Sequence, residues 1–353
     1  MNRIYLDWNA TAPLRIEARN AMVAAMDVLG NPSSVHAEGR AARAIVEKAR
    51  AQVAALVGCD SGDLVFTSGA TEAAHLVLSH GWNGVAASAG EHDAVLKNIK
   101  GIKHTLSLDR SGRAQCDVDG AALYAVAGAN SETGVVNDLA RFSDPALSDI
   151  TQTLGKIDQP TTPARYLIGA SHKIGGPKGV GFAVLKGGVE FHAIRGGGQE
   201  MGRRAGTENV VGIAGFGAAA AAARRDLDAG LWQRVATRRD RLETRLATEC
   251  PGVTFIGRAA PRLPNTSCFA LSGWKAETQV MQMDLAGCAV SAGSACSSGK
   301  VKASETLVAM GCDSSVVASA IRVSFGPSTT QNDLDKFADI WLAHSRRFAE
   351  KAA

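Results

Sequence analysis

Close pairs of cysteines are missing from this sequence. Its seven cysteines are an odd number, none belongs to a Cys-x-x-Cys pair, and they are scattered along 353 residues. Disulfide-stabilised domains and structural zinc sites need paired or clustered cysteines, so the pattern predicts neither, and we expect no metal site. Unpaired thiols suit a reducing compartment, which predicts a cytoplasmic protein. The cysteines are Cys59, Cys116, Cys250, Cys268, Cys288, Cys296 and Cys312.

Long apolar segments are missing as well. No stretch reaches the ~18 consecutive apolar residues that a membrane-spanning helix needs. The N-terminal sequence MNRIYLDWNA lacks the apolar run of a signal peptide. We therefore expect a protein without a membrane partner.

Charge of one sign is not concentrated anywhere. The chain has 38 basic and 34 acidic residues, which gives a net charge of +4, and the charges are not grouped in like-signed blocks. Aromatic residues make up only 5% of the chain, so few side chains could stack on bases. We therefore expect no nucleic-acid partner, while the small positive excess can serve small anions.

Short apolar runs are what the sequence does contain. Residues 64–66 and the runs GVAASA, ALYAVAGAN, RYLIGAS and GVGFAVLKG have the continuous apolar character of buried strands, with helical patterns between some of them. They predict an α/β fold whose sheet is covered on both faces. Before them, the spacing of apolar residues predicts a helix capped by Ser33 or Ser34 and ended by Gly58.

A second region follows the sequence GGGQEMGRRAGTENV. It opens with a long helical stretch rich in alanine and arginine, and beyond about residue 250 the strands VTFIG, NTSCFAL, CAVSAG and IRVSFG alternate with helices. The length of the chain favours about two domains. The pattern predicts a second, smaller α/β domain.

The sequence FTSGATE is a candidate anion site. A strand followed by Ser-Gly-Ala-Thr and a helix places free backbone N–H groups beside the hydroxyl of Thr71. The alternative is a plain capped turn between strand and helix. Nucleotide loops are not indicated, because GPKGVG and RGGGQEMG lack the Gly-Lys-Ser/Thr ending, and GFGAAA lies inside a helical run.

Two lysines lie in the glycine-rich sequence IGASHKIGGPKGVG. Lys173 follows a histidine at the end of an apolar run, and Lys178 lies within a turn. A surface lysine needs neither crowded glycines nor an apolar approach. A lysine that forms a covalent bond or touches a phosphate can use both.

Three further residues each allow two interpretations. Asp149 ends an apolar segment, either as a turn residue or as a buried acid that needs a positive partner such as a protonated heterocyclic nitrogen. Cys296, in SAGSACSSGK, is either structural or an accessible nucleophile. Arg322, in SAIRVSFGP, pairs either with an internal acid or with a substrate carboxylate.

Taken in order along the chain, these motifs resemble those of the cysteine desulfurases, which are pyridoxal-phosphate enzymes of the class V aminotransferase type. The resemblance runs from YLDWNATAP to about residue 335, and GNPSSVHAEGR, TSGATE and GSACSSG are its most specific parts. The segment around Cys296 matches the branch with the longer cysteine loop. The implied fold is the α/β fold-type-I transferase. It has a large cofactor domain (16–250) with a mostly parallel seven-stranded sheet, complete or trimmed, and a smaller α/β domain (1–15 and 251–353) with the cysteine and the substrate-binding arginine.

The resemblance also implies a role for each residue that contacts the cofactor. Lys173 would bind pyridoxal phosphate covalently, and Lys178 would be an ordinary turn residue. Asp149 would keep the ring nitrogen protonated, His92 would stack on the ring and move protons, and the 3′ oxygen would be bonded by one of two amides, Gln152 or Asn130. Thr71 and His172 would hold the phosphate, with Thr207 from a neighbouring subunit. The implied cofactor contacts are Ala70, Thr71, His92, Asn130, Asp149, Gln152, Ser171, His172, Lys173 and Thr207.

The implied reaction converts L-cysteine to L-alanine in a homodimer. Arg322, with Asn9 and Asn31, would bind the substrate, and Cys296 would take the sulfur as a persulfide. An acceptor protein would receive it, be it an iron–sulfur scaffold, a tRNA-modifying or thio-cofactor enzyme, or a small carrier. The alternatives are a selenocysteine lyase or another class V enzyme, and a relative without activity that serves as a binding partner.

Several features depart from the family pattern. Ser131 stands where relatives usually have asparagine, and Ala170 stands where a serine is usual. The segments 72–92 and 134–149 are each about a helical turn or two short, so the second has little room for a helix before its strand. The C-terminal tail is brief.

Overall fold

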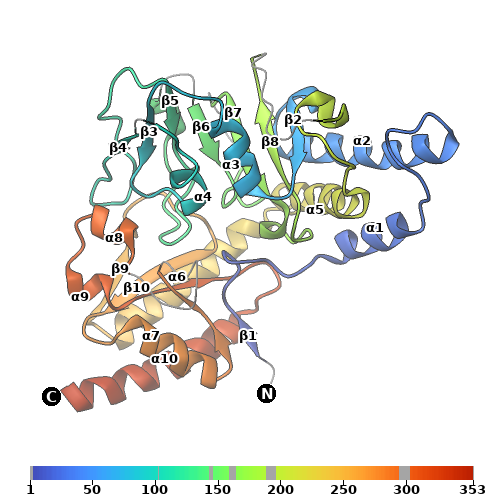
Figure 1. Cartoon of the computed structure of the whole chain (residues 1–353). Helices are drawn as coiled ribbons and strands as arrows, with labels where there is room; N and C mark the ends of the chain where they lie inside the picture. The colour runs from blue at the N-terminus through green and yellow to red at the C-terminus, as the bar shows by residue number, and fades with distance from the viewer. Residues whose placement is uncertain are drawn as a thin grey trace.

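The computed structural model describes residues 3–101, 103–142, 146–158, 164–187, 196–293 and 303–352 (Figure 1). A seven-stranded sheet, a four-stranded sheet and a two-stranded sheet organise them, and the four-stranded sheet lies toward both chain termini in Figure 1. In the described part of the chain no helix is long and apolar enough to cross a bilayer. The six cysteines that the structure describes are all free.

The larger sheet has seven strands, so none of the seven expected strands is missing. Five neighbouring strands pair in parallel, namely β7, β6, β5, β3 and β4. Strand β8 pairs antiparallel with β7 and with β2. In spatial order the strands are β2 (Leu64–Thr67), β8 (Gly181–Leu185), β7 (Tyr166–Ala170), β6 (Ala146–Asp149), β5 (Leu123–Ala125), β3 (Val85–Ser88) and β4 (Lys103–Leu106).

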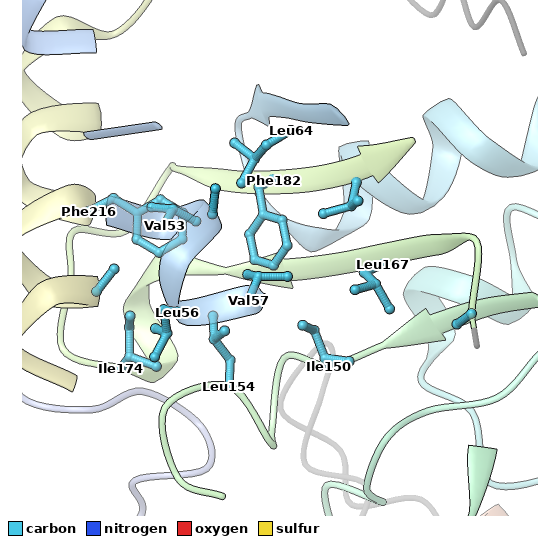
Figure 2. Packing of buried hydrophobic residues seen from close by; sticks show 14 of the residues in the cluster. Val53, Leu56, Val57, Leu64, Ile150, Leu154, Leu167, Ile174, Phe182 and Phe216 are labelled. Carbon is cyan, nitrogen blue, oxygen red and sulfur yellow. The ribbon is translucent and has the colours of Figure 1, made fainter. Parts of the chain in front are cut away.

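Helices cover both faces of this sheet, as the continuous apolar runs predict. Successive residues of a strand point to opposite faces. Leu64 accordingly packs with Val53 and Phe216 in one apolar cluster, whereas Val65 packs with Leu76 in another. Figure 2 shows the first cluster, which includes Phe182 and Leu167 of the sheet. The covering helices are α1 (Ile16–Met26), α2 (Ala37–Val57), α3 (Ala70–Leu78), α4 (Asp93–Leu96) and α5 (Val210–Asp228).

Two helix boundaries differ from the sequence prediction. Helix α2 is capped by His36, whose Nδ1 accepts from the amide of Gly39, rather than by Ser33 or Ser34. Its end at Gly58, with φ of 78°, is confirmed. The long alanine- and arginine-rich stretch is two helices, α5 and α6 (Leu231–Glu249), because Gly230 adopts a left-handed conformation between them.

The short segment before β6 has the expected effect. Among its described residues, only the 3₁₀ turn η2 (Leu139–Arg141) replaces a helix between β5 and β6. The other 3₁₀ turns are η1 (Ser61–Asp63), η3 (Ser171–Lys173) and η4 (Gln199–Gly202).

The smaller sheet is antiparallel and has its own core. The core is built around Trp341, Phe269 and Phe325, and helix α6 adds Trp232 and Leu246. Helix α6 therefore packs on the small sheet, although it precedes the predicted domain boundary at residue 250, and that division of the chain stays a prediction. The strands are β12 (Ser291–Ala292), β13 (Ala320–Ser324), β10 (Thr266–Leu271) and β9 (Val253–Ile256), beside the pair β1 (Ile4–Tyr5) and β11 (Cys288–Ala289). The helices are α6, α7 (Ala276–Leu285), α8 (Glu305–Ala309), α9 (Ser314–Val317) and α10 (Gln331–Ala352).

Candidate active site

A cavity of about 640 Å³ opens at the carboxyl ends of the parallel strands. His92 follows β3, Ala127 follows β5, Asp149 ends β6 and Ala170 ends β7. Ligands of open α/β sheets bind outside these strand ends, and the volume lies in the range of about 300–1,000 Å³ that is usual for small-molecule sites. Arg322 of the small sheet also lines the cavity, so both sheets contribute to its wall.

Most residues predicted for the site line this one cavity. They come from the N-terminal segment, from the start of α3, from the turns after β3, β6 and β7, and from β13. They are Asn9, Ala70, Thr71, His92, Asp149, Gln152, His172, Lys173 and Arg322.

Lys173 lies at the end of η3, directly after β7. Its Nζ donates to the carbonyl oxygens of Asn9, at 2.6 Å, and Ala10, at 2.8 Å. The turn requires glycine, because a Cβ atom at Gly176 would lie 2.0 Å from the Oγ of Ser171. Lys178 is in a turn, as predicted, but it also lines the cavity, which the sequence did not indicate.

Asp149 presents a carboxylate at the end of β6. Its Oδ1 accepts from the amide of Thr151 at 2.9 Å, and both residues line the cavity. The fully buried carboxyl of Glu91 lies behind this region. Burial raises the pKa of Glu91 to about 8, its bond from the amide of Ala127 lowers it, and the charge of Asp149 raises it further. The carboxyl of Glu91 is therefore mostly protonated at neutral pH.

The start of α3 has the geometry of an anion cradle. The residues from Ser68 to Thr71 line the cavity, while the amide of Ser68 donates to Glu72 at 2.7 Å and that of Gly69 to Thr67 at 3.4 Å. The first N–H groups of a helix lack partners within the helix, and the helix dipole favours an anion there. The turn is therefore capped at the amides of Ser68 and Gly69, and its place in the cavity wall favours an anion cradle at the amides that follow.

His172 faces the same cavity as a neutral imidazole. Burial lowers its pKa to about 4, and the positive charges of Lys173 and Lys178 act in the same direction. The Nδ1 of His172 lies 3.1 Å from the Oγ1 of Thr11. A neutral ring nitrogen beside the cradle can donate to an anion without carrying charge itself.

Arg322 has an internal acid partner and also lines the cavity. Its Nη2 donates to Asp7 at 2.7 Å, and its Nη1 donates to the carbonyl oxygen of Ser131 at 3.1 Å. The internal acid that the sequence left open is therefore Asp7, and the contact with a substrate carboxylate stays a prediction. The contact through Ser131 uses the backbone, so the serine that departs from the family pattern does not remove it.

Of the two amides considered for the ring oxygen, only Gln152 lines the cavity. Asn130 is buried in the turn after β5, where its Oδ1 accepts from the amides of Glu132 and Thr133, both at 2.9 Å. Its Nδ2 donates to the carbonyl oxygen of Gly90 at 3.0 Å. Asn130 therefore holds the backbone of the cavity wall in place without facing the cavity.

The remaining predicted residues lie elsewhere. Ser171 is fully buried at the start of η3, the turn that carries Lys173. Asn31 and Thr207 are exposed and do not line the cavity of their own chain. Cys296 lies outside the described residues, although Gly293, which precedes that part of the chain, lines the cavity.

Three polar residues of the site region were not found from the sequence. Asp7 pairs with Arg322 from 315 positions away, which sequence spacing cannot show. Glu91 directly precedes His92, and Lys156 follows Gln152 by four residues. The buried Nζ of Lys156 donates to the Oε1 of Gln152 at 3.0 Å. The four-residue spacing of Gln152 and Lys156 was the feature of the sequence that could have predicted their contact.

The residues present fit pyridoxal phosphate. An amine, a carboxylate, an imidazole and a helix N-terminus line one cavity, which matches an aldehyde, a ring nitrogen, an aromatic ring and a phosphate. Two buried polar atoms of lining residues, Thr151 Oγ1 and Arg322 Nε, have no hydrogen-bond partner within the described part of the chain. Among the described residues, no group of three or more histidine, cysteine or acidic side chains could hold a metal ion.

Comparisons with known proteins agree with this fit. The model of the aminotransferase class-V family, which uses pyridoxal phosphate, matches residues 4–337. A cysteine desulfurase of Sinorhizobium fredii is 36% identical over 99% of this chain and 98% of its own length. The cysteine desulfurase IscS of Dictyoglomus turgidum is 34% identical over 96% of this chain and 93% of its own. A NifS-like protein from Rickettsia africae superposes with a TM-score of 0.88 at 28% identity, covering 96% of this chain and 98% of its own. The chain belongs to the aminotransferase class-V family.

Proposed function

We propose that this protein is a cysteine desulfurase that converts L-cysteine to L-alanine and passes the sulfur to an acceptor. One observation carries the proposal: Lys173, Asp149, His92 and Arg322 line one cavity in a chain that is 36% identical to a cysteine desulfurase over nearly its whole length. The proposed reaction needs an amine, an acid, a proton carrier and a cation in one place.

The cavity offers a partner for each part of the cofactor. Lys173 would attach it, Asp149 would pair with its ring nitrogen, and Gln152 would donate to its ring oxygen. Thr71, the start of α3 and His172 would hold its phosphate. When bound, pyridoxal phosphate supplies an electron sink that weakens the bonds at the α-carbon of an amino acid.

The protein's own groups would orient and process the substrate. Arg322 would bind the substrate carboxylate, because Asp7 and the carbonyl of Ser131 hold its guanidinium in the cavity wall. His92 would move protons, since its Nδ1 caps α4 by accepting from Ala94 and its ring faces the cavity. The thiolate of Cys296 would bond to the substrate sulfur as the sulfur–carbon bond breaks.

A homodimer would complete the site. Six of the large apolar side chains that are exposed in the described chain lie between residues 14 and 35: Leu14, Ile16, Val23, Met26, Leu29 and Val35. An apolar surface of this kind typically marks a protein–protein contact. The segment with Thr207 is fixed nearby, because the side-chain Nε2 of Gln199 donates to the Oγ of Ser33 and the buried Glu200 pairs with Arg50. Thr207 would thereby reach the neighbour's phosphate, and Asn31 remains a predicted substrate contact.

The acceptor and the compartment belong to the same proposal. The sulfur would go to an iron–sulfur scaffold, a tRNA-modifying or thio-cofactor enzyme, or a small carrier, in the cytoplasm that free thiols suit.

The decisive experiment incubates the cofactor-loaded protein with L-cysteine and a thiol reductant and measures alanine and sulfide. Equal amounts of both are expected. A protein that binds the cofactor and forms neither product is not a desulfurase.

A further inference from the structure

A short turn after β6 lies under the cavity and belongs to the main core. Its amides bond locally, from Leu154 to the carbonyl of Ile150 at 2.8 Å and from Ile157 to that of Thr153 at 3.2 Å. Figure 2 shows Ile150 and Leu154 among the apolar side chains of the core. Gly155 has φ of 65°, and a Cβ atom there would lie 2.8 Å from that of Ala223. The turn is therefore held rigidly, and with it the two polar residues Gln152 and Lys156.

Lys156 is an amine buried in this apolar setting. The residue is 2% exposed, and it forms no ion pair with any acid that the structure describes. Its Nζ donates to the Oε1 of Gln152 at 3.0 Å. Burying an amine is costly, and an apolar side chain of the same shape would pack there more favourably. The stability of the core therefore does not account for this lysine.

The bond from Lys156 fixes which end of the Gln152 amide faces the cavity. In its charged form the lysine amine only donates hydrogen bonds, so it then holds the amide oxygen on its own side. The Nε2 of Gln152 then points the other way and donates to the carbonyl oxygen of Asn9 at 3.0 Å. The Nζ of Lys173 donates to that same carbonyl. Lys156, Gln152, Asn9 and Lys173 thus form one continuous chain of hydrogen bonds.

We propose that Lys156 is a positioning residue for the cofactor, which holds Gln152 so that its N–H₂ group can only donate into the cavity. This inference rests on the proposed function, in which Gln152 donates to the ring oxygen. An oxygen that carries negative charge needs a donor, and a freely rotating amide would present its own oxygen part of the time. Lys156 itself touches neither cofactor nor substrate.

The ionisation of Lys156 agrees with this role. Burial lowers its pKa to about 7, and the charges of Lys173 and Arg322 lower it further. A cation behind the ring oxygen is therefore present for part of the neutral range. The acidic residues that line the same cavity are Asp149 and Asp7. Loss of Lys156 would remove both the anchor of Gln152 and this positive charge.

The test uses the absorbance of the bound cofactor, which does not require turnover. The absorbance of the bound cofactor changes as the cofactor loses a proton. In Lys156→Met the pKa of this change is expected to rise by about one unit, because losing the hydrogen-bond donor to the ring oxygen favours the protonated cofactor. The dissociation constant for pyridoxal phosphate should rise by about tenfold. Gln152→Ala should cause similar changes. Adding Lys156→Met to Gln152→Ala should change neither the acid dissociation constant read from the absorbance nor the dissociation constant for pyridoxal phosphate by more than about twofold. Two residues that act through one contact do not have additive effects.

A matched control and a second variant complete the experiment. Lys48→Met, on the exposed side of α2, should titrate as the parent does. Lys156→Gln keeps an N–H donor and should retain most of the parent behaviour. Parent values in Lys156→Met, or an undiminished shift in the Gln152→Ala background, would overturn the inference. A chain that fails to fold with either substitution would also overturn it, since Lys156 would then be structural. If the parent itself binds no cofactor, the proposed function fails instead.

Discussion

The amine of Lys173 lies 2.6 Å from the carbonyl oxygen of Asn9, a residue 164 positions earlier in the chain. Further hydrogen bonds join the same two segments, because the N-terminal segment runs along the turn that carries Lys173. The amide of Ala12 donates to the carbonyl of His172 at 3.0 Å, and the amide of Arg15 donates to that of Gly175 at 2.8 Å. The first residues of the chain therefore position the lysine that is proposed to hold the cofactor.

Lys173→Ala should abolish both turnover and the absorbance of covalently bound cofactor. The amine is the only atom of this side chain that can form the bond, and alanine removes it. Borohydride reduction followed by peptide mass spectrometry is the direct measurement, because it fixes the cofactor on the lysine that binds it. The modified peptide should contain Lys173.

Lys178→Ala is the comparison, because Lys178 lies in the same cavity wall. Its removal should leave the covalent bond and the absorbance intact, even if the cofactor binds less tightly without this positive charge. A reduced adduct that maps to Lys178, or an absorbance lost in Lys178→Ala and kept in Lys173→Ala, would reverse the assignment.

Asp149→Asn should retain the cofactor and lose nearly all activity. The asparagine keeps the shape and can still accept from the amide of Thr151, but it has no charge to keep a ring nitrogen protonated. Cofactor content by absorbance and alanine formation are measured on the same sample. A parent-like rate with full cofactor content would exclude the proposed pairing.

Glu91→Gln should flatten the pH dependence of stability. In the folded state burial raises the pKa of Glu91 to about 8 from an ordinary value of 4.5, so the folded state binds more protons than the unfolded state between these values. The free energy of unfolding of the parent should therefore fall as the pH rises from about 4.5 to 8. Glutamine has no proton to lose, so the variant should lose less stability over this range.

Denaturant unfolding of the cofactor-free protein at pH 5 and pH 8, at one protein concentration, gives this comparison. Glu277→Gln, an exposed glutamate in the first turn of α7, should follow the parent. Parallel curves for the parent and Glu91→Gln would mean that Glu91 is ionised in the folded state.

The sequence predicted the large sheet well because its strands are buried on both faces. Continuous apolar runs mark such strands without any knowledge of their neighbours, and β2, β7 and β8 were found in this way. The cap of α2 was wrong, because His36 and the serines before it can all accept from a helix N-terminus. Local signals could not choose between them.

The candidate site was predictable where its residues fall in short motifs. Lys173, His172 and the start of α3 are examples, and all line the cavity. Partners joined across the fold were not predictable, as Asp7 and Arg322 show, because only folding brings β13 beside the N-terminal segment. The burial of Lys156 is likewise a property of the core and not of its neighbours in sequence.

The dimer should depend on the exposed apolar side chains between residues 14 and 35. Light scattering of the parent should give about twice the chain mass of 36.6 kDa. Leu29→Glu, at a side chain that is 83% exposed, should give monomers with little activity, because a charge at an apolar contact is costly. Leu285→Glu is the control, since Leu285 is 82% exposed on α7, far along the chain from this region. An active monomer would contradict the shared site.

The last prediction concerns the sulfur carrier. A free thiol has a pKa of about 8.5, so only a few per cent is thiolate at neutral pH, and the reacting cysteine needs help to lose its proton. The half-buried Cys59 and the buried Cys268 are worse placed, because burial raises the pKa of Cys59 to about 12 and also raises that of Cys268. Cys296→Ser should therefore still bind the cofactor and cysteine, seen as an absorbance change, but release no alanine at a steady rate. The exposed Cys116 is the matched control, and Cys116→Ser should keep the parent rate.

The measurement that decides the sulfur carrier is peptide mass spectrometry after adding cysteine without a reductant. One extra sulfur should appear on the peptide that contains SAGSACSSGK, and it should be absent in Cys296→Ser. The acceptor reaction then requires only that a second thiolate attack this outer sulfur, which leaves Cys296 free for another cycle. If the sulfur maps to Cys59, Cys268 or Cys312, or if Cys296→Ser desulfurates cysteine at the parent rate, the proposed transfer is wrong, while the fold and the cofactor site would stand.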